Sequence, residues 1–191
     1  MNKATHIYFE QSPNPNSLKF VMNYLIVPEG RSYDFPDPES AENAPLAKAL
    51  FGFDYVRRVF LMNNFVTITK DASVDWMEIR EELRTFIREY LETDKPVVNL
   101  GEVDLDNEEE VVEESEIDLK IRMLLEEYVR PAVEQDGGAI EYHSFKDGTV
   151  RVLLQGSCSG CPSSMLTLKA GIENLLKSMI PEVKTVEAEG I

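Results

Sequence analysis

Apolar and polar residues alternate in short runs over the first 70 residues, as expected of half-buried strands. The segments THIYFEQ and SLKFVMNYLI flank SPNPNS, in which prolines and asparagines favour a reversal of the chain. A short helix is predicted over residues 45–51. The runs VRRVFLM and FVTITK are separated only by Asn63 and Asn64, which predicts a β-hairpin.

A helical period replaces this alternation over residues 74–92. One apolar stripe recurs at helical spacing and is made of Trp76, Ile79, Leu83, Phe86, Ile87 and Tyr90. We expect the helix to pack this stripe against the sheet, because core packing is the usual origin of such a pattern. The opposite face is charged, and no histidine, cysteine or clustered carboxylates indicate a catalytic site in this half.

The C-terminal part predicts the element order α-β-β-α-β. An amphipathic helix covers residues 118–130, and Pro131 is expected to kink or end it. The strands AIEYHSF and TVRVLLQ are joined by a turn containing Asp147 and Gly148. A second helix is expected from about residue 163 to 179, followed by a last strand in VKTVEAE. The expected fold is two small α+β domains.

Charge divides the chain into three segments. The formal net charge is -16, and residues 96–117 alone carry nine acidic and no basic side chains. We therefore expect an N-terminal domain over 1–95, an extended acidic linker over 96–117 and a C-terminal domain over 118–191. The linker can be a tether or acidic docking strip, although a solubilising spacer is the more general interpretation of such a charge block.

The same acidic charge makes direct binding to nucleic acid or to an anionic membrane unfavourable, so the expected partners are proteins. No stretch has the roughly 20 apolar residues that a bilayer-spanning helix needs. Residues 1–11, MNKATHIYFEQ, contain neither a signal core nor an Arg-rich transit segment. On this basis the chain is expected to be cytoplasmic.

The candidate chemistry lies in GSCSGCPSS, which holds both cysteines of the chain, Cys158 and Cys161. The pair sits where a strand is expected to end and a helix to begin, and unpaired N–H groups at a helix start favour thiolates. Gly156 and Gly160 keep the loop slender, and Pro162 fits the first helical position. The stretch therefore predicts two thiols that ionise readily.

Two kinds of chemistry fit this pair. A dithiol oxidoreductase also places CxxC between a strand and a helix, but a hairpin rather than a βαβ unit precedes the motif here. A metal site normally takes four ligands, and two chains together offer four thiolates. A symmetric dimer can thus hold a 4Fe-4S cluster or a zinc ion, and the spacing alone does not choose between them.

Several motifs resemble the Nfu family, the NifU C-terminal-domain-like scaffold and carrier proteins of iron-sulfur cluster assembly. In the C-terminal part these are VRPAVEQDGGAIEY, VLLQGSCSGCPSSMLTLKAGIENLL and IPEV, in the family's order and spacing. In the N-terminal part, SPNPNSLKF, YDFP, APLAKALF, VTITK and DW resemble the domain that precedes it in mitochondrial-type Nfu proteins. The resemblance covers nearly the whole chain except the acidic linker.

The resemblance implies that Cys158 and Cys161 are the cluster ligands. It further implies a 4Fe-4S cluster that bridges a homodimer, is received from an upstream scaffold and is delivered to apo iron-sulfur proteins. The expected protein is a carrier and not an enzyme, with no catalytic residues.

Overall fold

The computed structural model describes residues 4–99, 115–159 and 162–190, with the side chains of residues 162–164 excepted. The chain divides into two compact units, Met1–Glu108 and Glu109–Ile191. Each is an α+β unit with its own sheet and its own core, so the predicted fold class is confirmed. No helix among these residues is long and apolar enough to cross a membrane.

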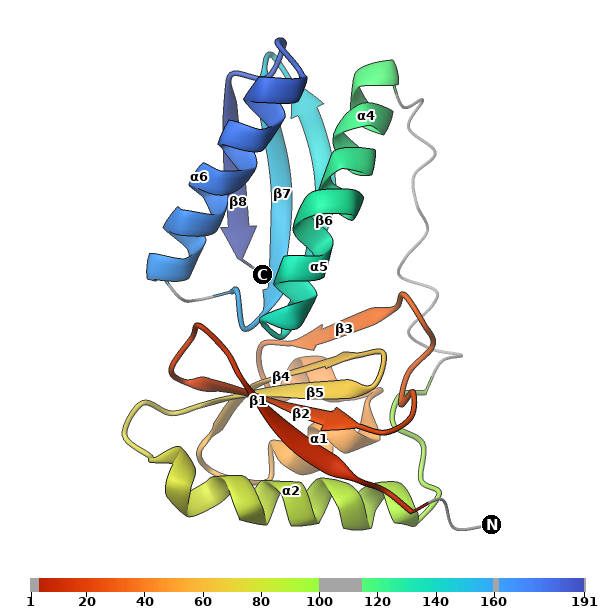
Figure 1. Ribbon diagram of the computed structural model, residues 1–191. Helices are drawn as coiled ribbons and strands as arrows, with labels where there is room; N and C mark the ends of the chain where they lie inside the picture. Colours follow the sequence, from red (N-terminus) through yellow and green to blue (C-terminus); the bar gives the residue numbers. More distant parts are fainter. Residues whose placement is uncertain (1–3, 100–114, 160–161, 191) are drawn as a thin grey trace. The chain divides into compact units, whose positions relative to one another are not determined.

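The N-terminal unit is built on a five-stranded antiparallel sheet (Figure 1). Its strands are β1 (Ile7–Gln11), β2 (Ser17–Met22), β3 (Ser32–Phe35), β4 (Val56–Met62) and β5 (Phe65–Lys70), in the spatial order β1-β2-β5-β4-β3. The β4–β5 hairpin turns at Asn63, which has a positive φ of 46°. This hairpin was predicted with the bounds that the structure shows.

The helices of this unit pack on one face of the sheet (Figure 1). They are the 3-10 helix η1 (Glu39–Ala41), α1 (Pro45–Leu50) and α2 (Trp76–Glu92). Asp75 caps α2 by accepting a hydrogen bond from the backbone N–H of Met77 at 2.8 Å. The predicted stripe does face the core, where Ile79, Leu83 and Ile87 are buried.

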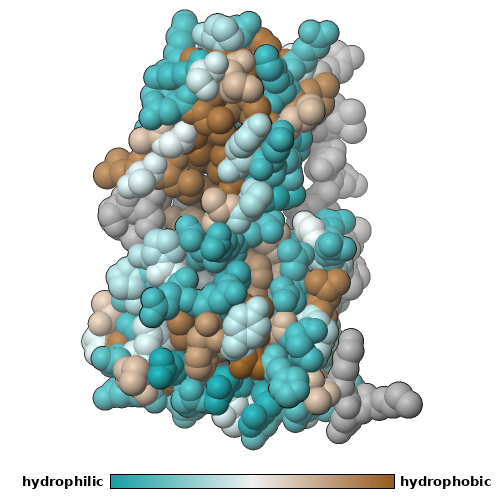
Figure 2. All heavy atoms as spheres, in the orientation of Figure 1, coloured by the Kyte–Doolittle hydropathy of each residue, from teal (hydrophilic) through white to brown (hydrophobic). Residues whose placement is uncertain are grey.

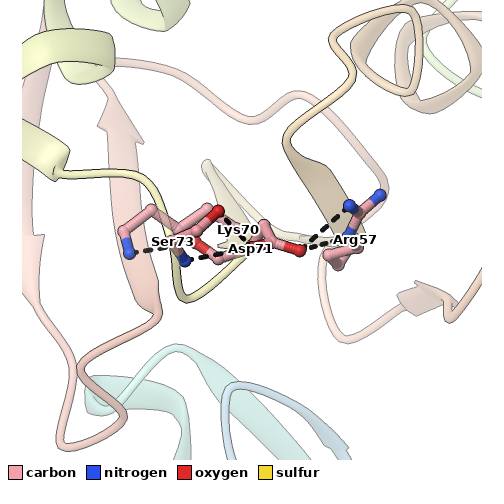
Figure 3. Close-up of polar contacts among 4 residues, drawn as sticks. All are labelled: Arg57, Lys70, Asp71 and Ser73. Carbon is pink, nitrogen blue, oxygen red and sulfur yellow. Dashed lines mark hydrogen bonds and ion pairs between the residues drawn. The ribbon is translucent and has the colours of Figure 1, made fainter.

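A polar cluster around Asp71 fixes the connection from β5 to α2 (Figure 3). The Asp71 carboxylate accepts hydrogen bonds from the hydroxyl and the N–H of Ser73, at 2.6 and 3.0 Å, and from two nitrogens of Arg57. These hydrogen bonds, with those from Ser73 the stronger, hold the pKa of Asp71 well below its usual range. The cluster therefore positions the first turn of α2 beside the sheet.

The C-terminal unit has a three-stranded sheet in the order β6-β7-β8. The strands β6 (Gly138–Lys146) and β7 (Thr149–Gly156) form an antiparallel hairpin, and β8 (Thr185–Gly190) pairs with β7 in parallel. Asp147 and Gly148 both have positive φ in the hairpin turn, as the Asp-Gly signal predicts. The helices α4 (Glu116–Leu124), α5 (Arg130–Gln135) and α6 (Pro162–Met179) share one core with this sheet.

The helical segment passes Pro131 instead of ending there. A π-helical turn, η2 (Leu125–Val129), links α4 to α5 and takes up the irregularity before Pro131, which lies at the start of α5. Proline has no backbone N–H to donate. Because the first N–H groups of a helix have no partner within the helix, a proline at this position removes no helix hydrogen bond. The irregularity predicted close to Pro131 therefore takes the form of a π-helical turn between the end of α4 and the start of α5.

Two other expectations differ from the structure. The strand β3 was not predicted, because its four residues, SYDF, are too few to show a clear period.

The segment expected as a linker, residues 96–117, has ordered residues of the two units at both of its ends. Asn99 donates to the carbonyl of Asn43 and Val98 is buried, while Glu116 and Ile117 already belong to α4. Residues 100–114 lie outside the described part, so the extended linker stays a prediction.

Candidate functional site

Cys158 lies just beyond the end of β7 with its side chain in the core of the C-terminal unit. The even-numbered residues of β7, Val150, Val152 and Leu154, are fully buried. The same two-residue period continues through Gly156 to Cys158, which is only 5% exposed. The alternation of the strand therefore sets the direction of the Cys158 thiol.

The turn formed by Ser157, Cys158 and Ser159 is held by hydrogen bonds to the α5–β6 connection and to β7. The Ser157 hydroxyl donates to the carbonyl of Asp136 at 2.6 Å, and its N–H donates to the carbonyl of Gly137 at 3.3 Å. The N–H of Ser159 donates to the carbonyl of Gly156 at 3.2 Å. The turn that holds Cys158 is thus fixed in part by residues 136 and 137, which lie about 20 positions earlier in the sequence.

Gly138 makes room for that thiol. It faces Gly156 across the β6–β7 ladder, and a Cβ at this position would lie 2.5 Å from the carbonyl oxygen of Gln155 and 3.0 Å from the Sγ of Cys158. Gly137 turns the chain into β6 with a φ of 88°, and Gly156 leaves β7 with a φ of 68°. The close approach of Gly138 to the cysteine was not predicted from the sequence.

Helix α6 begins at Pro162, as predicted for a proline at the first helical position. The motif therefore does connect a strand to a helix. Gly160 and Cys161 lie outside the described residues, so the distance between the two thiols and their joint role stay predictions. The same holds for the expected ionisation of both thiols.

The C-terminal half of α6 is linked to β8 by hydrogen bonds to the carboxylate of Glu173. Glu173 accepts hydrogen bonds from Lys177 at 2.6 Å, from the N–H of Val186 at 3.0 Å and from the hydroxyl of Thr185 at 3.1 Å. These bonds, with that from Lys177 the largest cause, lower the pKa of Glu173 to about 2. The helix that follows the cysteines is thereby anchored to the sheet.

The rest of the described chain offers no competing metal site. Among these residues, no group of three or more histidine, cysteine, aspartate or glutamate side chains is arranged to hold a metal ion. A metal centre at Cys158 therefore needs ligands beyond the described side chains around it.

Sequence reasoning did not predict the burial of Cys158. The signal was present, because the apolar period of TVRVLLQGSC runs from Val150 to Cys158 without a break. The turn residues Gly156 and Ser157 obscured it, since a strand period is usually assumed to stop at a glycine-containing turn.

These features define a two-unit α+β protein with a cysteine motif between a strand and a helix. Two family models match the chain: the scaffold protein Nfu/NifU N-terminal family over residues 7–94 and the NifU-like domain over residues 121–187. The chain belongs to the Nfu family, and each of its units corresponds to one of the two matched domains.

Similar curated proteins align with both units of the chain. The mitochondrial NFU1 iron-sulfur cluster scaffold homologue of Drosophila willistoni is 39% identical over 188 residues, which cover 98% of this chain. That of Drosophila persimilis is 38% identical over 185 residues, or 97% of this chain. The matched region is 65% of the length of each relative. A solution NMR structure of a NifU-like protein from Saccharomyces cerevisiae is 25% identical, covers 51% of this chain and 89% of that one, and has a TM-score of 0.46.

The expectation of a cytoplasmic location is wrong, because the similar curated proteins are named as mitochondrial. That expectation rested on the sequence of residues 1–11. Since the chain matches only 65% of its relatives' length, the residues at its start do not decide its location.

Proposed function

We propose that the chain is an iron-sulfur cluster scaffold and carrier rather than an enzyme. In this proposal Cys158 and Cys161 of two copies hold a 4Fe-4S cluster, which is received from an upstream scaffold and passed to apo iron-sulfur proteins. The observation that carries it is the cysteine pair between β7 and α6, within a domain of the NifU-like family. The names of the relatives as cluster scaffolds support the same role.

The number of thiols favours a shared site. A 4Fe-4S cluster is commonly held by four cysteine thiolates, and the chain has two cysteines. The described residues provide no further group of metal ligands, so a second copy is the simplest source of the other two. A site divided between two copies also favours release, because each copy loses only two bonds when the cluster leaves.

The C-terminal unit exposes apolar surface on which a second copy can pack. Figure 2 shows this surface on the face that carries α6. Leu166, in the second turn of α6 and close in sequence to both cysteines, is 70% exposed. Exposed apolar patches of this kind often mark protein contacts. We assign this surface to the contact between the two copies that hold the cluster.

Burial of Cys158 gives the carrier a second means of release. Cys158 is buried and belongs to the core cluster of the C-terminal unit, so its sulfur must turn outward to reach a ligand shared with another copy. We propose that the turn over Ser157–Ser159 moves when the cluster binds. Because the thiol returns to apolar surroundings on unloading, core packing competes with the iron-sulfur bond and assists transfer.

The relatives also support a mitochondrial setting, which we propose for this chain. The proposed partners are apo iron-sulfur clients and a cluster donor, with no nucleic acid and no membrane among them. The net charge of -16 suits neither of the latter.

Anaerobic reconstitution with iron and sulfide tests the proposal. We expect about two iron and two sulfide per chain in a dimer, and loss of both in Cys158→Ala and in Cys161→Ala. Ser178→Ala, which removes a hydroxyl in the last turn of α6, is the control and should load normally. Disulfide reduction without iron uptake would instead support an oxidoreductase, and zinc retained after iron challenge would support a structural zinc module.

A further inference from the structure

The N-terminal unit contains a hollow that the cysteine chemistry does not use. It has a volume of about 550 Å³ and is lined by residues of β1, the β1–β2 turn, β2 and the first turns of α2. That volume is within the range of small-ligand pockets. The lining residues are Phe9, Gln11, Ser12, Asn14, Pro15, Ser17, Leu18, Trp76, Met77 and Arg80.

Aromatic side chains hold the walls of this hollow in place. The indole N–H of Trp76 donates to the carbonyl of Pro15 at 3.0 Å, which ties α2 to the β1–β2 turn. Phe20 packs edge-on against both Phe9 and Trp76, with ring centroids at 5.4 and 6.5 Å. The aromatic walls are therefore already ordered, so a ligand need not organise them; the polar side chains of Gln11, Ser12, Asn14 and Ser17 complete the lining.

One cation lines this hollow. Of the described residues that line the hollow, Arg80 alone is charged, and its guanidinium lies 5.6 Å from the centre of the Phe9 ring. Its Nε is buried and has no hydrogen-bond partner among the described residues. Its neighbour Arg84, which also lies over Phe9, is instead paired with Glu81. Among the described residues, no carboxylate pairs with Arg80, so its guanidinium at the hollow favours a ligand that supplies an anionic oxygen.

We propose that this hollow binds an acidic peptide segment of a partner protein, with an aspartate or glutamate carboxylate on Arg80 and a neighbouring apolar side chain against Trp76. Charge complementarity supports this occupant, because the hollow is locally cationic although the chain carries a net charge of -16. Met77, at the rim, is 69% exposed and extends the apolar surface outward.

The position of β1 favours a peptide over a small anion. β1 is an edge strand of the sheet, and it contributes Phe9 and Gln11 to the lining. An edge strand offers backbone groups to which an extended peptide can pair, while adjacent pockets select its side chains. A segment that alternates acidic and apolar residues therefore fits this surface.

Trp76, the chain's only tryptophan, provides the readout in the full-length chain. The probes are the acetylated and amidated peptide Leu-Glu-Phe-Glu-Leu and its counterpart with glutamine in place of glutamate. We expect a saturable change in Trp76 fluorescence with the glutamate peptide and at least about tenfold weaker binding of the glutamine peptide. This comparison needs no variant and is independent of cluster loading.

Substitutions then locate the contact. Arg80→Gln should weaken binding of the glutamate peptide about tenfold or more, whereas Arg88→Gln, on the exposed face of the same helix, should not change it. Far-UV circular dichroism checks that both variants are folded. No saturable change up to millimolar peptide, equal affinity for the two peptides, or equal loss in the two variants would each overturn the proposal.

Discussion

Substitution of Gly138 by alanine tests the packing around the cysteine turn. The added Cβ would lie 2.5 Å from the carbonyl oxygen of Gln155, whereas real Cβ contacts are essentially never shorter than 3.0 Å. The nearest atom belongs to the backbone of β7, so no side-chain rotation relieves the contact. The β6–β7 ladder must therefore shift by about half an ångström, and the Cys158 sulfur at 3.0 Å must move with it.

Overpacking of this kind costs about 1–3 kcal/mol. For a unit of this size, each 1 kcal/mol lowers the unfolding midpoint by about 4–8 °C, so we expect a decrease of roughly 5–20 °C in the C-terminal unit. Thermal unfolding followed by far-UV circular dichroism measures it. Fluorescence of Trp76 reports on the N-terminal unit, which should unfold as in the unsubstituted chain.

Gly171→Ala is the matched control, because it adds the same methyl group at a helical position with no heavy atom within 4 Å. Alanine is favoured over glycine in a helix by about 0.5–1 kcal/mol, so this variant should be slightly more stable. An unchanged midpoint for Gly138→Ala, or equal shifts in the two variants, would refute the close packing of Gly138 against the cysteine turn.

Three further predictions concern the same unit. In the variant Cys161→Ser, modification of Cys158 by a maleimide should be at least about tenfold slower than in the unfolded chain, because its thiol is buried; equal rates would contradict this burial. Ser115→Ala removes the N-cap of α4 and should lower the free energy of unfolding by about 1 kcal/mol in a denaturant titration, and no loss would argue against the capping box. Finally, the pKa of Glu173 is lowered from 4.5 to about 2, so its contribution to stability is complete above pH 4.5 and is lost as the pH falls toward 2. Glu173→Gln should make the free energy of unfolding depend less on pH between about 2 and 4.5. An unchanged dependence would contradict the hydrogen bonds from Lys177 and β8 to Glu173.

The sequence predicted most elements because their periods are strong and their turns are distinctive. The strands over Val56–Met62 and Phe65–Lys70 have the predicted bounds, and the Asp-Gly turn lies between β6 and β7. The four-residue β3 was missed because so short a segment has no measurable period. The π-bulge before Pro131 was missed because proline's local preference does not reveal how the preceding turn accommodates it.

The position of the two cysteines between a strand and a helix could be predicted from the sequence, but the burial of Cys158 could not. Spacing placed Cys158 and Cys161 between a strand and a helix, and the family models agree with the domain in which they lie. The depth of Cys158 depends on contacts between residues far apart in the sequence, such as Gly138 and Gln155 with Cys158. The pocket at Arg80 likewise joins β1 to α2, which are more than 60 residues apart.

Native mass spectrometry of the reconstituted chain tests the central claim most directly. We predict one species containing two chains and one cluster of about four iron and four sulfide, which loses both the cluster and the dimer in Cys158→Ala and in Cys161→Ala. A single chain that carries a complete cluster, or a dimer that keeps its cluster when either cysteine is replaced, would contradict a cluster shared through these two thiols.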